Sequence, residues 1–467
     1  MLYRKAPFLL PVFLLVAQIS AAQNSTAPER QKPGEPVRVL QLSLDQAIDI
    51  ALSPDGDTRI RIAEELVHQA KARSMQSRAA LLPNVSASVG QQNMTRNLEA
   101  FGIRIEIPLP DYKPPSFVGP FNVFDARATA ALNVLNLSSI RHYQASRQGI
   151  RLAEEERENL QDQVRYTVAF AYLSLLRAKK SEETARSNVT LAERLVTLAE
   201  DQKAIGTGTG IEITRASVQL ANDQQRLLSA ANEVNRARLE LLRTLGLNLN
   251  LEVEPIENME YEKMSVYEPQ EALEIALLSR ADWKAQQKRE EAARLNKSAT
   301  WMERLPSVSL FADYGTIGTS VNHSIPTRTY GFSVQIPVFD GGRMDSRRAE
   351  VSSLLREEME RTKDLRRQIE LDIRVSIDSL KSADLQVAAA REGLELAQKE
   401  YAQAERRFEA GVGSSIEVTD AQTRLARARE NRIQALFAFN LAQLDLCNSM
   451  GTIKQIIPGD RNEHQIQ

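Results

Sequence analysis

The residue types that most often carry chemistry are few and widely separated in this sequence. Four histidines occur, without the short spacing of a metal site: His68, His142, His323 and His464. The segment GTGTG at 206–210 lacks the lysine and the Ser/Thr of a phosphate-binding loop, and no predicted strand precedes it. The sole cysteine, Cys447, cannot form an internal disulfide, and we interpret it as a packed side chain. The sequence therefore predicts no enzyme, no cofactor and no bound metal.

The charge balance also argues against nucleic acid as a partner. The 467 residues include 59 Lys and Arg against 61 Asp and Glu, so the formal net charge is −2. No basic field is available to hold a polyanion. The high charged fraction (26%) and low aromatic fraction (5%) favour long solvated helices over a large aromatic core.

Residues 1–22 have the pattern of an export signal. Arg4 and Lys5 precede a short apolar run at 8–17, and the small residues 20–22 predict cleavage before Gln23. The alternative is a retained membrane anchor, for which the apolar run is short. No cysteine lies near the cleavage site, so we expect no lipidated N-terminus. No apolar helical span follows, so we expect any contact with a membrane to be made by strands.

Proline placement predicts two very long helices. All 18 prolines lie outside residues 121–254 and 338–457, and proline disrupts a helix interior. The predicted helices are Ser138–Ile205 and Arg343–Ala410. Each would be about 100 Å long at 1.5 Å per residue, so they must pack along other helices.

Each long helix is predicted to end at a glycine-rich turn. The turns are IGTGTGIEITRA, from Ile205, and AGVGSSIEVTDAQ, from Ala410. Glycine stops helices because it accepts left-handed backbone angles. Return helices should follow at Ile211–Leu245 and Ile416–Met450. Seven-residue spacing within them indicates helices that wrap around each other, as a two-stranded coiled coil or a larger assembly: Leu220, Leu227, Val234 and Leu241; Ala421, Ala428, Ala435 and Ala442.

The chain also repeats itself upstream of these helices, so we expect two related halves that pack with pseudo-symmetry. LSLDQAIDIAL at 42–52 matches PQEALEIALL at 269–278 in its spacing. The predicted divisions are a signal peptide (1–22), a linker (23–40), first-repeat helices (41–82), a β-hairpin with a long outer loop (83–137), a helical hairpin (138–246, tip 206–210), an equatorial linker (247–268), a second-repeat helix (269–304), a β-hairpin (305–340), a helical hairpin (341–451, tip 411–415) and a tail (452–467).

Alternating apolar and polar residues predict four strands. The clearest run is Thr329–Val338; others include 84–89 and 307–314, and the run ending near 132–137 is weaker. Such alternation suits a membrane barrel strand, with one face to lipid and one to a wet lumen, and it also suits a soluble hairpin with one buried face. Four strands cannot close a barrel, whereas three chains would supply twelve. Residues 91–120 have no counterpart in the second half and are interpreted as an enlarged outer loop or a strand extension.

Four motifs in this order resemble the TolC-like outer-membrane efflux proteins over nearly the whole mature chain. They are GTGTGIEITRA, EALEIALLSRADW (Glu271–Trp283), QIPVFDGGR (Gln335–Arg343) and GVGSSIEVTDAQ. The resemblance implies a mainly α fold with a small β part. It implies a homotrimer with one shared twelve-stranded barrel in the outer-membrane lipid and a helical tunnel in the periplasm. Its partners would be a periplasmic adaptor protein and an inner-membrane pump.

In that family the glycine turns are the periplasmic tips at which the adaptor docks. Carried onto this sequence, the docking residues are Gly206, Gly208, Gly210, Ile211, Thr214 and Ala216 in one tip, and Gly411, Gly413, Ser414, Ile416, Thr419 and Ala421 in the other. The structural alternative is that they only form a tight αα-turn and cap the return helix.

The resemblance also implies an acidic ring near the tips that narrows the tunnel. The candidates are Glu400, Glu405, Glu409, Glu200 and Asp201. Converging carboxylates would repel one another, and cations or opening would relieve the repulsion. The alternative is that these side chains are simply solvated.

Together these observations predict a passive exit duct of an efflux system. An exported coiled-coil scaffold or adhesin without a pore is the alternative.

Overall fold

The computed structural model describes residues 39–53, 56–102, 117–206, 208–262 and 267–456. The predicted signal peptide lies outside these residues. Within them, the helices are α1 Leu44–Leu52, α2 Thr58–Ala79, α3 Leu137–Ala204, α4 Gly210–Thr244, α5 Pro269–Ser279, α6 Ala281–Met302, α7 Arg343–Glu409 and α8 Ser415–Ser449. The strands are β1 Val39–Leu42, β2 Asn84–Asn97, β3 Phe117–Leu135, β4 Glu252–Pro255, β5 Ser307–Gly318 and β6 Ser324–Gln335. None of the described helices is both long and apolar enough to span a bilayer.

The two long helices occur where the proline-free stretches predict them. α3 has 68 residues and α7 has 67, and each bound lies within one residue of the prediction. The side chain of Asn136 caps the start of α3 by accepting a hydrogen bond from the Ser139 amide at 3.0 Å. The return helices α4 and α8 have 35 residues each. A local cap therefore sets the start of the first hairpin.

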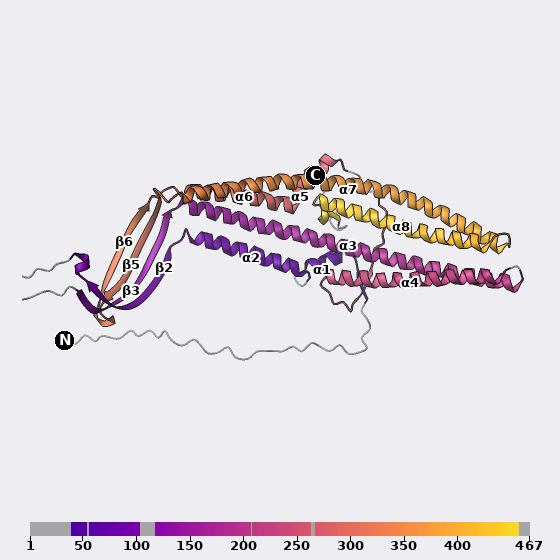
Figure 1. Cartoon of the computed structure of the whole chain (residues 1–467), viewed down its shortest axis with the longest axis horizontal. Coiled ribbons are helices and arrows are strands. Elements are labelled where there is room, and N and C mark those ends of the chain that lie inside the picture. Colours follow the sequence, from indigo (N-terminus) through magenta and orange to yellow (C-terminus); the bar gives the residue numbers. More distant parts are fainter. Residues whose placement is uncertain (1–38, 54–55, 103–116, 207, 263–266, 457–467) are drawn as a thin grey trace, which may run out of the picture. The chain divides into compact units, whose positions relative to one another are not determined.

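The helices pack as two antiparallel hairpins, α3–α4 and α7–α8, whose turns lie at the same end (Figure 1). Helices α2 and α6 lie along α3, and α6 also contacts α7. Apolar clusters follow these contacts instead of forming one central core. One cluster lies between the hairpins near their turns and includes Tyr401, Phe408, Val418 and Ala421. A second joins α5, α6, α7 and α8 around Trp283, Ile373 and Phe439.

Residues 269–304 form two helices, so the prediction of a single second-repeat helix is wrong. The break is at Arg280, whose backbone is extended and caps both α5 and α6. Its guanidinium is held by the Asp282 carboxylate at 2.7 Å and by the carbonyl of Ser449 at 3.0 Å. A contact from α8 therefore stabilises the bend. No proline or glycine near Arg280 predicts the bend from the sequence.

The large sheet is antiparallel, in the order β2-β3-β5-β6. Strand β2 extends to Asn97 and β3 begins at Phe117, so the ends of the 91–120 segment are strand extensions, whereas 103–116 lie outside the described residues. The predicted strand Thr329–Val338 is shifted: β6 begins at Ser324 and ends at Gln335, opposite Ser307, the first residue of β5. Pro337 has no amide to donate, which helps to end the ladder there.

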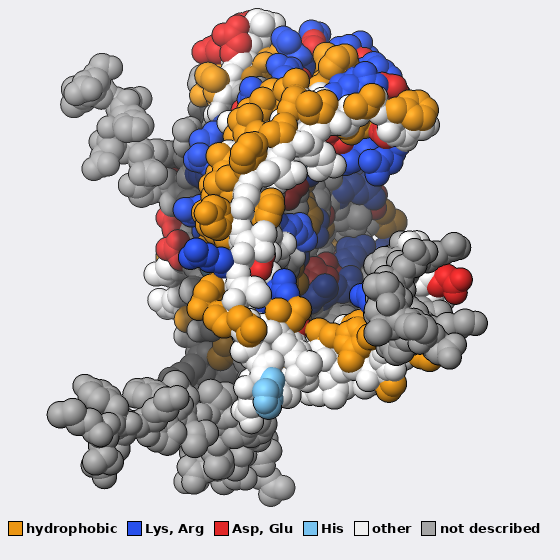
Figure 2. All heavy atoms as spheres, turned by 90° about the vertical axis from the view of Figure 1, so that its left-hand side faces the viewer, with side chains coloured by type: hydrophobic (Ala, Val, Ile, Leu, Met, Phe, Trp, Pro, Cys, Tyr) orange, Lys and Arg blue, Asp and Glu red, His pale blue; other side chains and the backbone are white. Residues whose placement is uncertain are grey.

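The sheet has one apolar face and one polar face, because cross-strand partners share a face. The apolar face carries Val85, Ala87 and Val89 of β2, Phe124, Ala126, Ala128, Ala130 and Leu132 of β3, Val308, Leu310 and Ala312 of β5, and Tyr330, Phe332 and Val334 of β6. The other face carries Ser86, Thr129, Asp313 and Thr329 in one row, and Arg127 there pairs with Asp313 at 3.7 Å. Figure 2 shows hydrophobic side chains gathered in a band along the strands, beside the white backbone. The alternation predicted from the sequence is confirmed.

A second, two-stranded sheet was not predicted from the sequence. β1 pairs with β4 in parallel, with Val39 opposite Glu252 and Leu42 opposite Pro255. Both strands have four residues. β4 lies in the predicted equatorial linker (247–268), whereas β1 begins in the predicted linker (23–40) and ends in the segment predicted as first-repeat helices (41–82). The hydroxyl of Tyr172 on α3 donates to the carbonyl of Leu42, the last residue of β1, at 3.0 Å. The small sheet thereby holds the start of the described chain against α3.

Candidate functional site: the tips of the helical hairpins

The turn between α3 and α4 uses glycine for conformation and for space. Gly206 has φ +82°, in the left-handed region. A β-carbon at Gly208 would lie 2.9 Å from the Lys203 amide nitrogen, and the Gly208 amide donates to the carbonyl of Gln202 at 2.9 Å. Gly210 begins α4. The turn is therefore tight. Gly206 supplies the left-handed backbone angle, and Gly208 leaves the space that a side chain would fill.

The turn between α7 and α8 has the same construction 205 residues later. Gly411 has φ +74°. The Gly413 amide donates to the carbonyl of Arg407 at 2.9 Å, and a β-carbon at Gly413 would lie 3.0 Å from the Arg407 β-carbon. The Ser414 side chain caps α8 by accepting from the Glu417 amide at 3.4 Å. The repeated sequence thus produces a repeated turn.

The residues predicted to dock a partner divide into surface and interior positions. Ile211 and Ile416 are exposed, by 66% and 51%, at the first turns of α4 and α8. Ala216 and Ala421 are buried in the cluster between the hairpins. Thr214 and Thr419 each donate to a carbonyl four residues earlier, at 3.2 and 2.8 Å. Direct contact with a partner is therefore open to the isoleucines and the turns, whereas the alanines contribute packing.

Polar contacts join the two tips to each other. The Gln202 side-chain amide on α3 donates to the Phe408 carbonyl at 2.6 Å. The Arg215 guanidinium on α4 donates to the Ser415 hydroxyl at 3.0 Å. Both contacts flank the apolar cluster that contains Phe408 and Val418. The tips are consequently held together by a small core with hydrogen bonds at its rim.

Further from the tips, a polar layer lies between α3, α4 and α8. Its centre is the carboxylate of Asp223, which is only 1% exposed. That carboxylate accepts from Gln219 at 3.0 Å and from Gln422 on α8 at 3.3 Å, and it pairs with Arg226 at 3.1 Å. The Gln422 side-chain oxygen is buried without a hydrogen-bond partner among the described atoms. A buried carboxylate needs such donors, because unpaired burial of its charge is costly.

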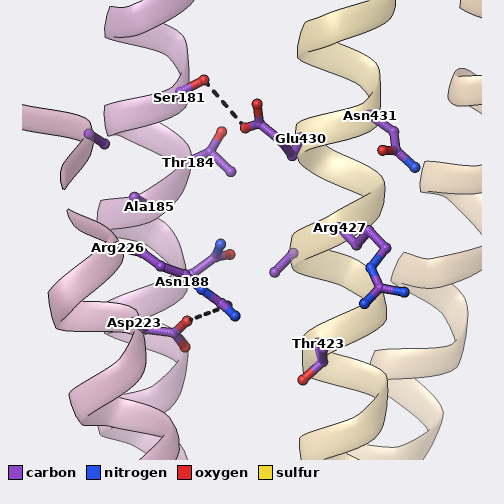
Figure 3. A pocket seen from close by; sticks show the side chains of 12 residues that line it. Ser181, Thr184, Ala185, Asn188, Asp223, Arg226, Thr423, Arg427, Glu430 and Asn431 are labelled. Carbon is purple, nitrogen blue, oxygen red and sulfur yellow. Dashed lines mark hydrogen bonds and ion pairs between the residues drawn. The ribbon is translucent and has the colours of Figure 1, made fainter. Parts of the chain in front are cut away.

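A cavity of about 360 Å³ adjoins this layer (Figure 3). Figure 3 shows Ser181 and Glu430 pointing toward one another across it, and the two side chains are hydrogen-bonded at 3.3 Å. Sequence reasoning missed this layer. Asp223 lies seven residues after the buried Ala216 and fourteen before the buried Ala237, so all three fall on the same face of α4. A charged residue at this seven-residue spacing is the sequence signal that could have predicted the layer.

The five acidic candidates are in different environments. Glu400 forms an ion pair with Arg424 of α8. Glu405 accepts a hydrogen bond from the Tyr401 hydroxyl at 3.1 Å, and burial together with the Glu405 charge raises the pKa of Tyr401. Glu200, Asp201 and Glu409 are exposed near the turns. An acidic gate stays a prediction for all five residues.

No metal-binding group appears in the part of the chain that the structure describes: no cluster of three or more His, Cys, Asp or Glu could hold an ion. Cys447 lies partly buried on α8, and burial raises the pKa of its thiol. A packed rather than reactive thiol fits this environment.

The chain is similar to known proteins over most of its length. Residues 55–247 and 272–452 match the family described as "Outer membrane efflux protein". The pyoverdine export outer membrane protein OpmQ of Pseudomonas aeruginosa is 23% identical over 87% of this chain and 85% of its own. The toluene efflux pump outer membrane protein TtgF of Pseudomonas putida is 24% identical over 76% of this chain and 72% of its own.

Solved structures share the fold. The outer-membrane channel OprN has a TM-score of 0.76 at 18% identity, covering 88% of this chain and 90% of that one. The outer membrane protein VceC from Vibrio cholerae has a TM-score of 0.74 at 18% identity, covering 87% and 96%. The family match spans both halves, including both glycine turns and the strands between the helices. The chain therefore belongs to the outer membrane efflux protein family and is an outer-membrane efflux channel.

Proposed function

We propose that the channel is a homotrimer whose strands close into one twelve-stranded barrel. The outer edges of β2 and β6 have no strand partner among the described residues. Unpaired backbone groups are costly in lipid, so each edge needs another chain. Pairing β6 of one chain with β2 of the next satisfies both edges. The apolar face of the sheet would then contact lipid, and the face with Arg127 and Asp313 would line the lumen.

The helices carry a second argument for the trimer. On α4 and α7, exposed residues follow coiled-coil spacing although no described helix covers them. These rows are Thr214, Val218, Ala221, Gln225 and Leu228 on α4, and Leu371, Val375, Asp378, Ser382, Leu385, Ala389, Glu392 and Leu396 on α7. In a closed tunnel, α4 of one chain would pack against α7 of its neighbour. We name the two rows together the α4/α7 seam.

The tips would dock a periplasmic adaptor that connects the channel to an inner-membrane pump. The two turns have the same backbone construction, so a trimer would present six similar tips. Exposed Ile211 and Ile416 beside the glycine turns supply an apolar contact, and the close-packed turns allow a partner helix to approach. Relatives named as outer membrane proteins of efflux pumps support a pump partner for this chain.

Transport through this duct would be passive, and opening would require the tips to separate. The contacts from Gln202 to Phe408 and from Asp223 to Gln422 join the first hairpin to the second. A hairpin that swings outward must break them and expose the small core. Relatives are named for cargoes as different as pyoverdine and toluene, which supports selection of cargo by the pump.

The unpaired sheet edges carry the trimer proposal most directly, and cross-linking across them tests it. With Cys447→Ser as background, Ser86→Cys on β2 would be combined in turn with Thr327→Cys, Thr329→Cys and Ser333→Cys on β6. All four positions lie on the polar face. Oxidation in outer-membrane extracts should give covalent trimers for at least one pair and none for single substitutions. Monomers from every pair, with a monomeric mass in detergent, would reject the shared barrel.

A further inference from the structure

The end of α6 and the start of α7 meet at the base of the large sheet and are joined by three polar contacts. Arg347 donates to the Glu303 carboxylate at 3.2 Å, and Arg304 donates to that of Asp345 at 2.5 Å. Arg348 donates to the carbonyl of Trp301 at 3.1 Å. We call this group the α6–α7 junction: Trp301, Glu303, Arg304, Arg343, Asp345, Arg347 and Arg348.

Large apolar side chains are exposed at the same place. Trp301 is 54% exposed although the Arg348 guanidinium lies 4.4 Å from the centre of its ring, so one ring face is covered and the other is open. The segment between β6 and α7 exposes Val338 by 92% and Phe339 by 89%. Such a concentration of exposed apolar surface marks an interaction site. It continues the apolar face of β6, which ends with Phe332 and Val334.

One arginine of the junction, Arg343, has only a weak ion pair among the described residues. Arg343, the first residue of α7, is 76% exposed in its side chain, and its nearest carboxylate contact is a distant one of 3.9 Å to Asp340. Asp340 already accepts hydrogen bonds from the amides of Gly342 and Met344, at 3.2 and 2.8 Å. The Arg343 guanidinium therefore presents donors to the outside. Basic side chains lie beside hydrophobic ones near the top of Figure 2.

We propose that the α6–α7 junction binds the headgroup of an anionic phospholipid, with Arg343 on the phosphate and Trp301, Val338 and Phe339 against the acyl chains. This proposal rests on the proposed placement of the sheet in the membrane. A guanidinium matches phosphate oxygens in a planar fork. An amphipathic indole suits the level of lipid headgroups. The adjoining apolar residues favour a lipid over a free anion, because a soluble anion would leave them in water.

The chain offers a built-in probe for this contact. It has two tryptophans, and the other, Trp283, is buried among α5, α7 and α8. A Trp283→Phe variant of the full-length protein would be reconstituted in phosphatidylcholine vesicles with brominated phosphatidylglycerol or, separately, brominated phosphatidylcholine at equal mole fraction. Bromine quenches nearby indole fluorescence. We expect the anionic lipid to be enriched about fivefold around Trp301, the effect of roughly one arginine at a membrane surface.

Matched variants separate headgroup binding from ordinary lipid contact. In the Trp283→Phe background, Arg343→Gln should remove most of the preference for the anionic lipid. Arg356→Gln removes the same charge from an exposed position further along α7 and should leave the preference intact.

Three outcomes would overturn the proposal. Equal quenching by both lipids would reject it while leaving the membrane placement standing. Loss of the preference on adding inorganic phosphate would assign the site to free anions. No quenching by either lipid, in a sample that still cross-links as a trimer, would reject lipid contact at this junction while leaving the trimer standing. No quenching from a monomer would reject the proposed assembly as well.

Discussion

The side-chain amide of Gln202 on α3 donates a 2.6 Å hydrogen bond to the main-chain carbonyl of Phe408 in the last turn of α7. Gln202 and Phe408 are both buried, and the bond joins two hairpins that are separated by 206 positions in sequence. Buried hydrogen bonds are costly to break, because each freed polar group must find another partner. This pair therefore favours the arrangement in which the tips stay together.

Gln202→Ala should loosen the tips and raise passage through the resting channel. The variant removes the bond to the Phe408 carbonyl, which keeps only the bonds of its own turn, at a cost of about 0.5–1.5 kcal/mol. We expect a higher open probability in planar-bilayer recordings and greater sensitivity of cells to large antibiotics. Gln403→Ala, at an exposed position of α7, is the control. Equal conductance of the Gln202→Ala and Gln403→Ala channels would contradict a holding role for Gln202.

Alanine at the turn glycines should lower stability, whereas alanine inside the long helix should raise it. Gly206 and Gly411 have positive φ, where a β-carbon costs roughly 1–2 kcal/mol. Gly393 lies within α7 with open space around a built β-carbon, so Gly393→Ala should stabilise the helix by about 1 kcal/mol. The thermal midpoint followed by circular dichroism in detergent tests both signs. A rise for Gly206→Ala would refute the role assigned to its backbone.

Glutamate at the exposed tip isoleucines should weaken adaptor docking without unfolding the tip. Ile211→Glu and Ile416→Glu would place a charge in a contact that is otherwise apolar, and we expect at least about a tenfold weaker interaction, or 1.4 kcal/mol. Quantitative cross-linking to the cognate adaptor measures this. Leu278→Glu provides the same change at an exposed site of α5. Undiminished cross-linking of the double variant would exclude these residues as contacts.

A charge in the α4/α7 seam should weaken the trimer. Leu385 on α7 and Leu228 on α4 are 71% and 73% exposed within one chain, and both would be buried between chains. Leu385→Glu and Leu228→Glu should therefore lower the temperature at which unheated trimers dissociate on gels. Leu278→Glu should not. If both seam variants dissociate at the temperature of the unsubstituted protein, α4 and α7 do not form the interface.

Alkaline pH should weaken the contact between α3 and α8. The Tyr166 hydroxyl donates to the Asp445 carboxylate at 2.7 Å, and burial plus this partner raise the pKa of Tyr166 to about 12. Because the folded value exceeds the unfolded value of 10.0, the stabilisation is complete below pH 10 and is lost as the pH rises toward 12.

Tyr166→Phe removes this bond and should lower the thermal midpoint at pH 8. The variant should also lose less stability than the unsubstituted protein between pH 10 and 12. Parallel pH profiles of the two proteins would show that the titration of Tyr166 is not coupled to folding.

Family membership decides the choice that the sequence patterns left open. A periodic helix and an alternating strand fit both a channel and an exported scaffold, because each pattern reports only which faces are apolar. The match over residues 55–247 and 272–452 excludes the scaffold or adhesin alternative. Adaptor docking and the acidic gate stay predictions, since a single chain contains neither a partner nor a closed ring.

The sequence by itself determined the helices and their turns. Absence of proline, followed by glycine, located α3, α7 and the two tips, because helix interiors and ends depend on residues within one or two turns. Alternation likewise predicted the two faces of the large sheet.

Only the tertiary structure decided which distant residues meet. The β1–β4 pair, the bend at Arg280 and the burial of Asp223 against Gln422 each depend on contacts across more than 160 positions. No local pattern encodes such a contact, because the same side chain is solvated or buried according to what packs against it.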